Sequence, residues 1–338
     1  MIKAIYKGKK NVQLINDEIP KAGDNGIVIK NIYSSICGTD VAVYNHGNET
    51  GHKIDIGQEF GHETISRVIE VGKNVKGINV GEIVYPYPLF AKNDTKRAGT
   101  LGAFSEYILI PNCVLNKSVY KLKEGIDLKE ACLIEPFTVG CRSARISKPQ
   151  KGETAVVFGA GTIGIAAAIR LKYFGIEKVM IVDLSDFRLQ KCKTLGFEIC
   201  NSAKENLKEI MVEYFGTAHS LNGETANVDI FIDAAGADSI LQAYQKIGKI
   251  ESRLVVVAVN KGLKEVDILS LTYSQHSIIG SGGYMPQDVS DVMEIMASKK
   301  YDIQSIITDE FSINDLPKAL EQAGKTYESL NVIINFDI

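Results

Sequence analysis

The stretch from Glu153 to Asp183 is the feature that most constrains the fold of this chain. It begins with a short apolar run, Thr154–Phe158, and continues through the glycine turn GAGTIG. A helix-like segment then extends to about Phe174, and Gly175 follows at the position typical of a helix C-cap. A second apolar run ends at Asp183. This order of strand, glycine turn, helix, strand and acid predicts a doubly wound α/β domain.

The glycines of the turn have separate tasks. Gly159 allows the tight turn, Gly161 lets the backbone approach a pyrophosphate, and Gly164 lets the helix pack against the strand. The helix N-terminus presents free N–H groups to phosphates. Asp183 lies 19 residues after Gly164 and is placed to accept hydrogen bonds from an adenosine ribose. The stretch predicts dinucleotide binding, and the alternative is a glycine-rich turn in another doubly wound domain. The cofactor-binding residues expected in the turn are Gly159, Gly161, Thr162, Ile163 and Gly164.

The composition is that of an ordinary globular protein. The 338 residues are enough for two domains, with 45% hydrophobic and 23% charged residues. The net charge of −3 gives the protein no overall positive charge that would attract nucleic acid, so we expect no nucleic-acid partner. No apolar run approaches the ~18 residues of a membrane helix, and the first residues do not begin a signal peptide. The six cysteines are widely spaced and contain no CxxC pair, which argues against a disulfide framework. We therefore expect a cytoplasmic protein with no membrane partner.

The N-terminal part of the chain has a different pattern from the glycine-turn unit. Residues 1–30 read as short strands joined by turns, with no helix between them, which predicts an antiparallel, barrel-like β unit. Residues 127–147 read as one helix. The helix leads into a hinge at 148–152, where proline and glycine mark a domain boundary.

The residues after the hinge alternate between strand and helix patterns. Buried strands are expected at 229–233, 254–259 and 277–280. Such strands predict a parallel sheet that is covered on both faces. Ligands bind at the carboxyl ends of these strands, so Ala235, Val257 and Ser281 are candidate cofactor contacts. Each is equally what a packed strand end would contain.

A second group of candidate residues lies upstream of the dinucleotide unit. The motif Cys37-Gly38-Thr39-Asp40 is followed by Gly61, His62 and Glu63, and His62 lies 22 residues after Asp40. A thiolate, an imidazole and a carboxylate are ligand types that Zn²⁺ prefers, and a catalytic zinc takes three ligands from the protein plus a water. Taken alone, a single cysteine and a His-Glu pair are more often structural than metal-binding.

The combination of motifs resembles the zinc-dependent medium-chain dehydrogenase/reductase superfamily, specifically its polyol and threonine dehydrogenase branch. The resemblance covers nearly the whole chain. The motifs that carry it, besides the glycine turn, are CGTD at 37–40, GHE at 61–63, IEVG at 69–72, GINVGEIV at 77–84 and IEP at 134–136.

The resemblance implies a set of zinc ligands. Cys37 and His62 correspond to ligands, and Glu63 resembles the third ligand of polyol dehydrogenases or one that exchanges with water. Glu135 stands where alcohol dehydrogenases place a second cysteine, and in this branch it binds the metal or holds its water. The alternative for Glu135 is a carboxylate that favours the dipole at a helix N-terminus.

The resemblance also implies a proton path. Asp40 corresponds to the carboxylate that orients the ligand imidazole, a partner that such histidines nearly always have. Thr39 corresponds to the hydroxyl that takes the substrate alcohol proton. Many relatives carry a histidine three positions later, where this chain has Ala42. His46 is a candidate substitute, or equally a surface loop residue.

Two further departures from the family are visible. Many relatives have four closely spaced cysteines that hold a structural zinc, whereas the stretch between Val84 and Phe104 contains no cysteine. We therefore expect one catalytic zinc per chain and no structural zinc. The segment Lys92–Arg97 within this stretch reads as an exposed loop. Gly283 replaces the arginine that polyol dehydrogenases often carry before a tyrosine, which weakens a match to sorbitol dehydrogenase itself.

The fold implied by the resemblance is α/β with two domains. A Rossmann NAD-binding domain with a doubly wound parallel sheet is expected at 149–285. A β-rich, GroES-like catalytic zinc-binding domain is expected at 1–148 and, after the chain returns, at 286–338. The catalytic domain would therefore be discontinuous in sequence.

The activity implied is reversible hydride transfer between a secondary alcohol, such as a polyol or polyol phosphate, and NAD. NAD is favoured over NADP because Asp183 would repel a 2′-phosphate. Arg188 resembles a residue that contacts the adenosine side of the cofactor, and the alternative is a solvated helix residue.

L-threonine and 2,3-butanediol are alternative substrates that suit the same zinc chemistry. The rival interpretations are a zinc-free quinone reductase and a non-catalytic NAD-binding protein. We expect a homodimer or homotetramer.

Overall fold

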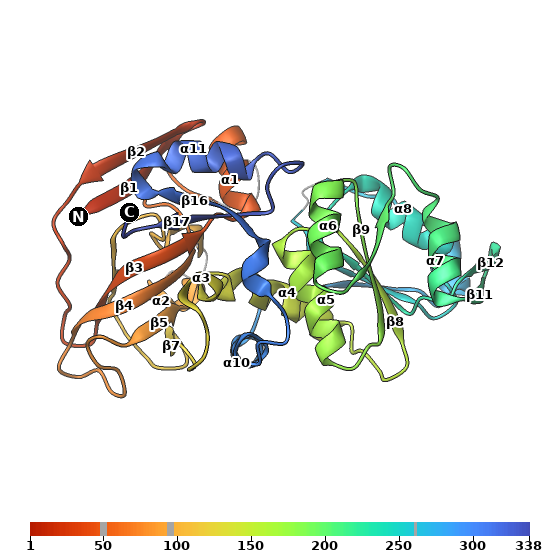
Figure 1. Cartoon of the computed structure of the whole chain (residues 1–338), viewed down its shortest axis with the longest axis horizontal. Helices are drawn as coiled ribbons and strands as arrows, with labels where there is room; N and C mark the ends of the chain where they lie inside the picture. The colour runs from red at the N-terminus through yellow and green to blue at the C-terminus, as the bar shows by residue number, and fades with distance from the viewer. Residues whose placement is uncertain (48–52, 93–97, 260–261) are drawn as a thin grey trace. The chain divides into compact units, whose positions relative to one another are not determined.

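The computed structural model describes residues 1–47, 53–92, 98–259 and 262–338. The chain divides into two compact units (Figure 1). The first unit contains Met1–Glu135 and Met296–Ile338, and the second contains Pro136–Ile295. The first unit is thus built from two separate stretches of sequence. No helix among the described residues has both the length and the apolar character needed to cross a bilayer.

The first unit is β-rich, as its turn-rich sequence predicts. Its main sheet has the strand order β16-β17-β3-β4-β5-β7, and β6 pairs with β3. The central strands β3 and β4 are antiparallel neighbours, and β17 brings the C-terminal segment alongside β3. The strands of this sheet are β3 (Ile27–Ser35), β4 (Glu63–Val71), β5 (Ile83–Pro86), β6 (Tyr107–Ile110), β7 (Val119–Lys121), β16 (Ile307–Ser312) and β17 (Asn331–Asn335).

Apolar packing holds the remaining elements of the first unit to this sheet. The antiparallel pair β1 (Ile2–Gly8) and β2 (Asn11–Asn16) shares one core with the helices α1 (Gly38–His46) and α11 (Leu316–Ala323). Phe60 and Phe104 meet edge to face in this core, with ring centroids 5.3 Å apart. This core joins segments from both stretches of sequence. The short helices here are α2 (Pro88–Ala91) and α3 (Leu128–Ala131).

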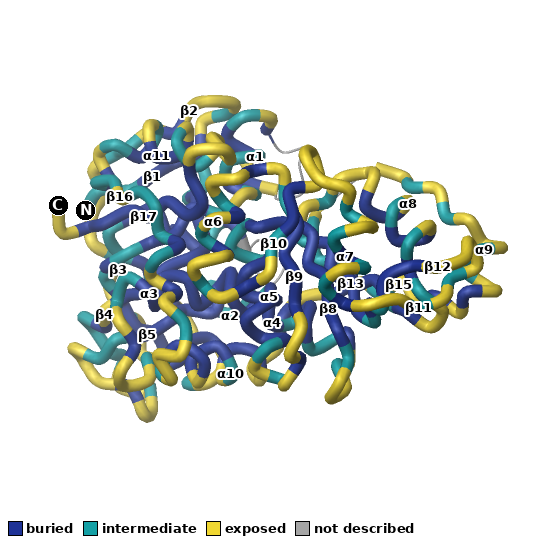
Figure 2. The backbone as a smooth tube through the Cα atoms, turned by 45° about the vertical axis from the view of Figure 1, so that its right-hand side comes forward, coloured by how far each residue is buried: buried dark blue, intermediate teal, exposed yellow. Residues whose placement is uncertain are grey.

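The second unit contains the predicted parallel sheet. Its strand order is β10-β9-β8-β13-β14-β15, and all five pairings are parallel. Every residue of the central strands β8 and β13 is buried, as expected for a sheet that is covered on both faces (Figure 2). The strands are β8 (Thr154–Phe158), β9 (Lys178–Asp183), β10 (Glu198–Asn201), β13 (Ile230–Asp233), β14 (Arg253–Val256) and β15 (Ser277–Gly280).

Helices alternate with these strands along the chain. They are α4 (Ile134–Ile146), α5 (Thr162–Tyr173), α6 (Asp186–Thr194), α7 (Leu207–Phe215), α8 (Asp238–Ile247), α9 (Ile268–Tyr273) and α10 (Pro286–Ala297). A hairpin of β11 (Thr217–Ser220) and β12 (Gly223–Ala226), which we did not predict, stands between α7 and β13.

The prediction of one helix over 127–147 is wrong. The chain forms α3 and then α4, with Cys132 and Leu133 between them. Pro136 explains the break, because a proline in a helix interior clashes with the carbonyl four residues earlier. Because α4 begins at Ile134, Pro136 lies in its first turn, where the backbone N–H has no partner within the helix and its absence costs nothing.

Candidate functional site

The first part of the site is the start of helix α1, directly after strand β3. Cys37 is the N-cap residue of α1. The carboxylate of Asp40, at the third helical position, accepts a hydrogen bond from the backbone N–H of Cys37 through Oδ2 at 3.1 Å. This reciprocal capping satisfies a donor that the helix leaves free. The motif CGTD therefore fixes the Cys37 thiol by local backbone geometry.

The other oxygen of Asp40 faces His62. The Nδ1 atom of His62 lies 3.3 Å from Oδ1 of Asp40, and both side chains are buried. Burial acts to lower the pKa of His62, but Asp40 and Cys37 raise it, and the resulting pKa lies well above its usual range. With Nδ1 toward Asp40, the opposite nitrogen, Nε2, faces Glu63, whose Oε1 is 4.0 Å away. This is the orientation of a metal-binding imidazole whose other nitrogen faces a carboxylate.

Three potential ligand atoms converge here. One donor atom from each of Cys37, His62 and Glu63 lies within 4.8 Å of the others, and the described residues contain no second group of this kind. Cys37 comes from the start of α1, whereas His62 and Glu63 stand where β4 begins. The antiparallel β3–β4 pairing places the end of β3, which leads into α1, next to the start of β4. The residues Cys37, His62 and Glu63 are therefore neighbours in space.

Glu135 belongs to the same electrostatic environment. It occupies the first turn of α4, and it is buried. Burial and then the carboxylate of Glu135 raise the pKa of Glu63 to about 8. Burial and then Glu63 raise the pKa of the Cys37 thiol to about 11. Several acidic groups thus share a buried space, which is costly unless a cation compensates them.

This donor set fits a zinc ion. Thiolate, imidazole and carboxylate are its ordinary ligands, and binding would displace the protons that Cys37 and Glu63 hold in its absence. The three converging residues are Cys37, His62 and Glu63, and Glu135, which is buried and raises the pKa of Glu63, stays a predicted ligand.

Thr39 stands beside the cluster. It is half-buried, and its hydroxyl donates to Sγ of Cys37 at 3.1 Å. The hydroxyl of Thr39 therefore lies next to the sulfur of a proposed zinc ligand. Ala42 is also half-buried, whereas His46, the last residue of α1, is exposed. Residues 93–97 of the predicted loop Lys92–Arg97 lie outside the described residues.

Sequence reasoning missed two buried polar neighbours of the cluster. Ser35 is the register partner of Glu63 on strand β3, and its hydroxyl interacts with that carboxylate. Asn331, on β17, donates from Nδ2 to Oγ of Ser35 at 3.0 Å. No sequence signal identifies Asn331, because it lies 296 residues from Ser35.

The glycine turn has the geometry that its sequence predicts. Gly159 has φ of +105°, a conformation that favours glycine. A Cβ on Gly164 would lie 1.8 Å from the carbonyl oxygen of Gly159, so only glycine permits this close packing. A Cβ on Gly161 would meet only Nη1 of Arg188, at 3.8 Å. Gly161 is the N-cap of α5, and Thr162 and Ile163 are its half-buried first residues.

Asp183 ends strand β9 and is half-buried. Its Oδ2 accepts from the N–H of Ala160 in the glycine turn at 2.7 Å. Its Oδ1 accepts from the N–H groups of Leu184 and Ser185, at 2.7 and 2.9 Å. Burial lowers the pKa of Arg188, and Asp183 partly opposes that shift. Asp183 and Arg188 thus lie together beside the turn, and their contacts with a cofactor remain predictions.

The predicted strand-end residues lie at one edge of the parallel sheet. Ala235 follows β13 and is exposed, and Val257 follows β14 and is half-buried. Ser281 follows β15 and is buried, and its Oγ has no hydrogen-bond partner among the residues that the structure describes. These positions agree with the rule that ligands bind beyond the carboxyl ends of parallel strands.

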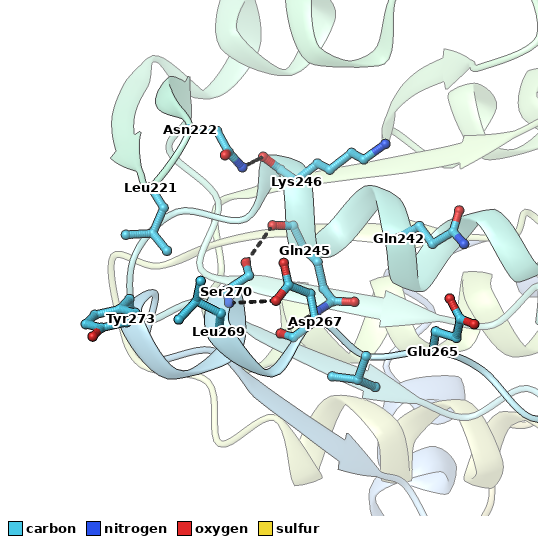
Figure 3. A pocket seen from close by; sticks show the side chains of 11 residues that line it. Leu221, Asn222, Gln242, Gln245, Lys246, Glu265, Asp267, Leu269, Ser270 and Tyr273 are labelled. Carbon is cyan, nitrogen blue, oxygen red and sulfur yellow. Dashed lines mark hydrogen bonds between the residues drawn. The ribbon is translucent and has the colours of Figure 1, made fainter.

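A separate cavity of about 970 Å³ lies between the β11–β12 hairpin, α8 and α9 (Figure 3). Ser270 lines it and bonds to Asp267 and Gln245. Leu221, Leu269 and Tyr273 also line it, and all three are exposed. None of the predicted site residues lines this cavity, so its size does not make it the reactive site.

Comparisons with known proteins agree with this architecture. Residues 23–123 match the alcohol dehydrogenase GroES-like domain, and residues 162–298 match the zinc-binding dehydrogenase family. The chain is 26% identical over 348 residues to L-threonine 3-dehydrogenase of Shewanella oneidensis, with 98% of each chain covered. It is also 26% identical to 2-dehydro-3-deoxy-L-galactonate 5-dehydrogenase of Pseudoalteromonas atlantica, covering 99% of this chain and 98% of that one.

Solved structures share the fold. 2R,3R-butanediol dehydrogenase from Bacillus subtilis superposes with a TM-score of 0.85 at 24% identity, covering 99% of both chains. Galactitol-1-phosphate dehydrogenase from Escherichia coli does so with a TM-score of 0.82 at 18% identity, covering 99% of this chain and all of that one. With the two domain matches and the full-length relatives, this chain belongs to the zinc-dependent medium-chain dehydrogenase/reductase superfamily, within its polyol and threonine dehydrogenase-like branch.

Proposed function

We propose that this protein is a zinc-dependent oxidoreductase that transfers a hydride between a secondary alcohol, a polyol or polyol phosphate, and NAD. The observation that carries the proposal is the convergence of Cys37, His62 and Glu63 within 4.8 Å. L-threonine and 2,3-butanediol are the alternative substrates, because relatives with those names share the full length of the chain.

One zinc ion per chain would be held by Cys37, His62 and one or both of Glu63 and Glu135. When bound, zinc acts as a Lewis acid that lowers the pKa of the substrate alcohol. Asp40 holds the imidazole of His62 in orientation. The hydroxyl of Thr39 accepts the alcohol proton and passes its own to solvent, since Ala42 takes the place of the histidine found in many relatives.

The second unit would bind the dinucleotide. Gly161 leaves room for a pyrophosphate at the N-terminus of α5, where free N–H groups favour an anion. Asp183 supports NAD over NADP, because its carboxylate stands at the end of β9 and would repel a 2′-phosphate. Arg188 lies beside Asp183 and would contact the adenosine side.

The proposed functional domains are 1–148 with 286–338 for the zinc site, and 149–285 for NAD. The compact units of the structure change elsewhere, after Glu135 within α4 and after Ile295 within α10.

We also propose that the protein is a homodimer or homotetramer, with β15 in an interface. Ser277 and Ser281 donate their N–H groups toward the β14 side, to Ser252 and Val256. The alternation of a strand then leaves the N–H groups of Ile278 and Gly280 at the outer edge. Such an edge is a template for pairing with another chain.

Metal analysis and a substrate screen test the proposed function. We expect about one zinc per chain, with NAD reduction in a screen of polyols, polyol phosphates, L-threonine and 2,3-butanediol. The variants Cys37→Ala and His62→Ala should lose zinc and activity but retain NAD binding, since the NAD residues belong to the other unit. Wild-type turnover by a zinc-free variant would refute the assignment. Zinc-free wild type would favour a quinone reductase or a non-catalytic NAD-binding protein.

A further inference from the structure

We propose that Ser35 and Asn331 are positioning residues that hold the carboxylate of Glu63 for metal binding. This inference rests on the proposed zinc site and adds two residues that the family motifs do not contain. It assigns a functional task to the C-terminal strand β17.

The first step of the argument is the contact between Ser35 and Glu63. The two residues are direct partners in the antiparallel β3–β4 ladder, where side chains on one face of neighbouring strands meet. Both side chains are buried. The register places the hydroxyl of Ser35 on the same face of the sheet as this carboxylate, and their interaction lowers the pKa of Glu63 against the larger effect of burial.

The second step is the contact between Asn331 and Ser35. The amide Nδ2 of Asn331 donates to Oγ of Ser35 at 3.0 Å, so Ser35 receives a hydrogen bond and keeps its own proton to donate. The amide oxygen of Asn331 lies 3.5 Å from Oγ, at the outer limit for a hydrogen bond. The anionic carboxylate is the stronger acceptor for that proton. We therefore infer that Asn331 donates to Ser35 and that the proton of Ser35 is directed toward Glu63.

The register of β17 makes this arrangement possible. Ile333 pairs with Ser35, and the N–H of Ile36 donates to the carbonyl of Val332 at 3.0 Å. The next residue along β17, Asn331, is therefore beside the end of β3, where Cys37 begins helix α1. The amide of Asn331 is buried there.

The third step concerns the free oxygen of Glu63. Its Oε2 is buried and has no hydrogen-bond partner among the described residues. A buried carboxylate oxygen without a partner is costly, and a bound cation would remove that cost. Since neutral donors hold the carboxylate, they add no positive charge that would compete with a divalent cation.

The test compares two serines of one strand. Ser34 and Ser35 are both fully buried, but the hydroxyl of Ser34 donates to the carbonyl of Ala103 at 2.6 Å. We would measure zinc dissociation from Ser35→Ala, Ser34→Ala and wild type by transfer to a chromophoric chelator. Ser35→Ala should weaken zinc binding about tenfold to a hundredfold, and Ser34→Ala should not.

Cobalt substitution gives a second readout that does not depend on activity. We expect Ser35→Ala to change the visible d–d bands of the Co²⁺ protein, while the thiolate-to-metal band from Cys37 remains. Asn331→Leu, on a different strand, should shift both readouts in the same direction, and Ser35→Thr, which keeps the hydroxyl, should restore them. The effects of Ser35→Ala and Asn331→Leu should be less than additive, because they interrupt one chain of hydrogen bonds.

The outcomes separate this inference from the proposed function. If wild type binds zinc and the Ser35→Ala and Asn331→Leu variants keep its affinity and Co²⁺ spectrum, the positioning role is wrong while the zinc site stands. Equal losses in Ser34→Ala and Ser35→Ala would show a general effect of strand packing and would also overturn the role. If wild type binds no zinc, both proposals fail.

Discussion

The imidazole of His62 and the carboxylate of Asp40 form a buried pair, with Nδ1 and Oδ1 3.3 Å apart. The same carboxylate caps helix α1 through its other oxygen, which accepts from the N–H of Cys37. One side chain thus contacts two proposed zinc ligands, one at the N-cap of helix α1 and one directly before strand β4.

Asp40→Asn should separate these two tasks of Asp40. Asparagine retains an oxygen that can accept from Nδ1 or from the helix N–H, but it lacks the negative charge that makes the imidazole more basic. We expect zinc affinity to fall about tenfold to a hundredfold, measured by chelator competition. Asp17→Asn, which alters an exposed carboxylate paired with Lys3, is the control. Unchanged zinc affinity in Asp40→Asn would refute the electrostatic role.

Asp183→Ala should narrow the preference for NAD over NADP. The change removes a hydrogen-bond acceptor for the ribose and a charge that repels a 2′-phosphate. A charged hydrogen bond contributes ~1.5–3 kcal/mol, so NAD binding should weaken roughly ten- to a hundredfold in calorimetry. Asp186→Ala, an exposed acid three residues further on, is the matched control. If neither cofactor's affinity changes, Asp183 does not face the ribose.

Thr39→Val should slow the chemical step while zinc and NAD remain bound. Valine is close to threonine in shape but lacks the hydroxyl that lies 3.1 Å from the Cys37 sulfur. General acid–base transfer by a positioned group contributes 10²–10⁴-fold, and single-turnover kinetics should show about that loss. Thr39→Ser should retain most of the rate. A Thr39→Val enzyme at wild-type speed would exclude the hydroxyl from proton transfer.

The same kinetics identify the outer proton acceptor. His46 is exposed at the end of α1, and we expect His46→Ala to leave the pH profile unchanged because solvent takes the proton. A rate loss at low pH that added buffer restores would instead place His46 in the path.

Ile278→Lys should break the proposed subunit interface. Ile278 is 37% exposed on β15, and its lysine variant would place a charge at the strand edge. Wild type should have a mass above the 37.0 kDa of one chain in light scattering, and the variant should shift toward that value. Val80→Lys, at an exposed valine of the first unit, should leave the mass unchanged. A monomeric wild type would contradict the proposal.

His276 should make stability depend on pH. It is 7% exposed, its ring centroid lies 4.7 Å from that of Tyr244, and its Nε2 lies 3.1 Å from the carbonyl oxygen of Lys249. Burial lowers the pKa of His276 below its usual value, so the unfolded chain binds a proton at a higher pH than the folded protein.

The free energy of unfolding should therefore fall as pH drops below about 6.5, with a slope from this residue of up to ~1.4 kcal/mol per pH unit. The loss ends once the pH is below the folded-state pKa. His276→Gln keeps an N–H donor but cannot titrate, so the difference between variant and wild-type denaturation curves should grow in that range. Parallel curves would show that His276 does not titrate on unfolding.

The sequence by itself determined the local units of this protein. Residues 154–183 predicted β8, α5 and β9 because glycine conformations and apolar periodicity act over a few residues. The helix break before Pro136 was also present in the sequence, and we missed it because the apolar pattern of 127–147 continues across it. The motifs around Cys37 and His62 predicted the candidate ligands through the family resemblance, whereas the capping of Cys37 by Asp40 is a local contact that we did not predict.

Only the tertiary structure decided how distant segments meet. The β3–β4 register places Ser35 opposite Glu63, and β17 brings Asn331 to Ser35 across 296 positions of sequence. A one-residue shift in either pairing would turn these side chains to the other face of the sheet. Such a register depends on how the whole core packs, so no window of sequence contains it.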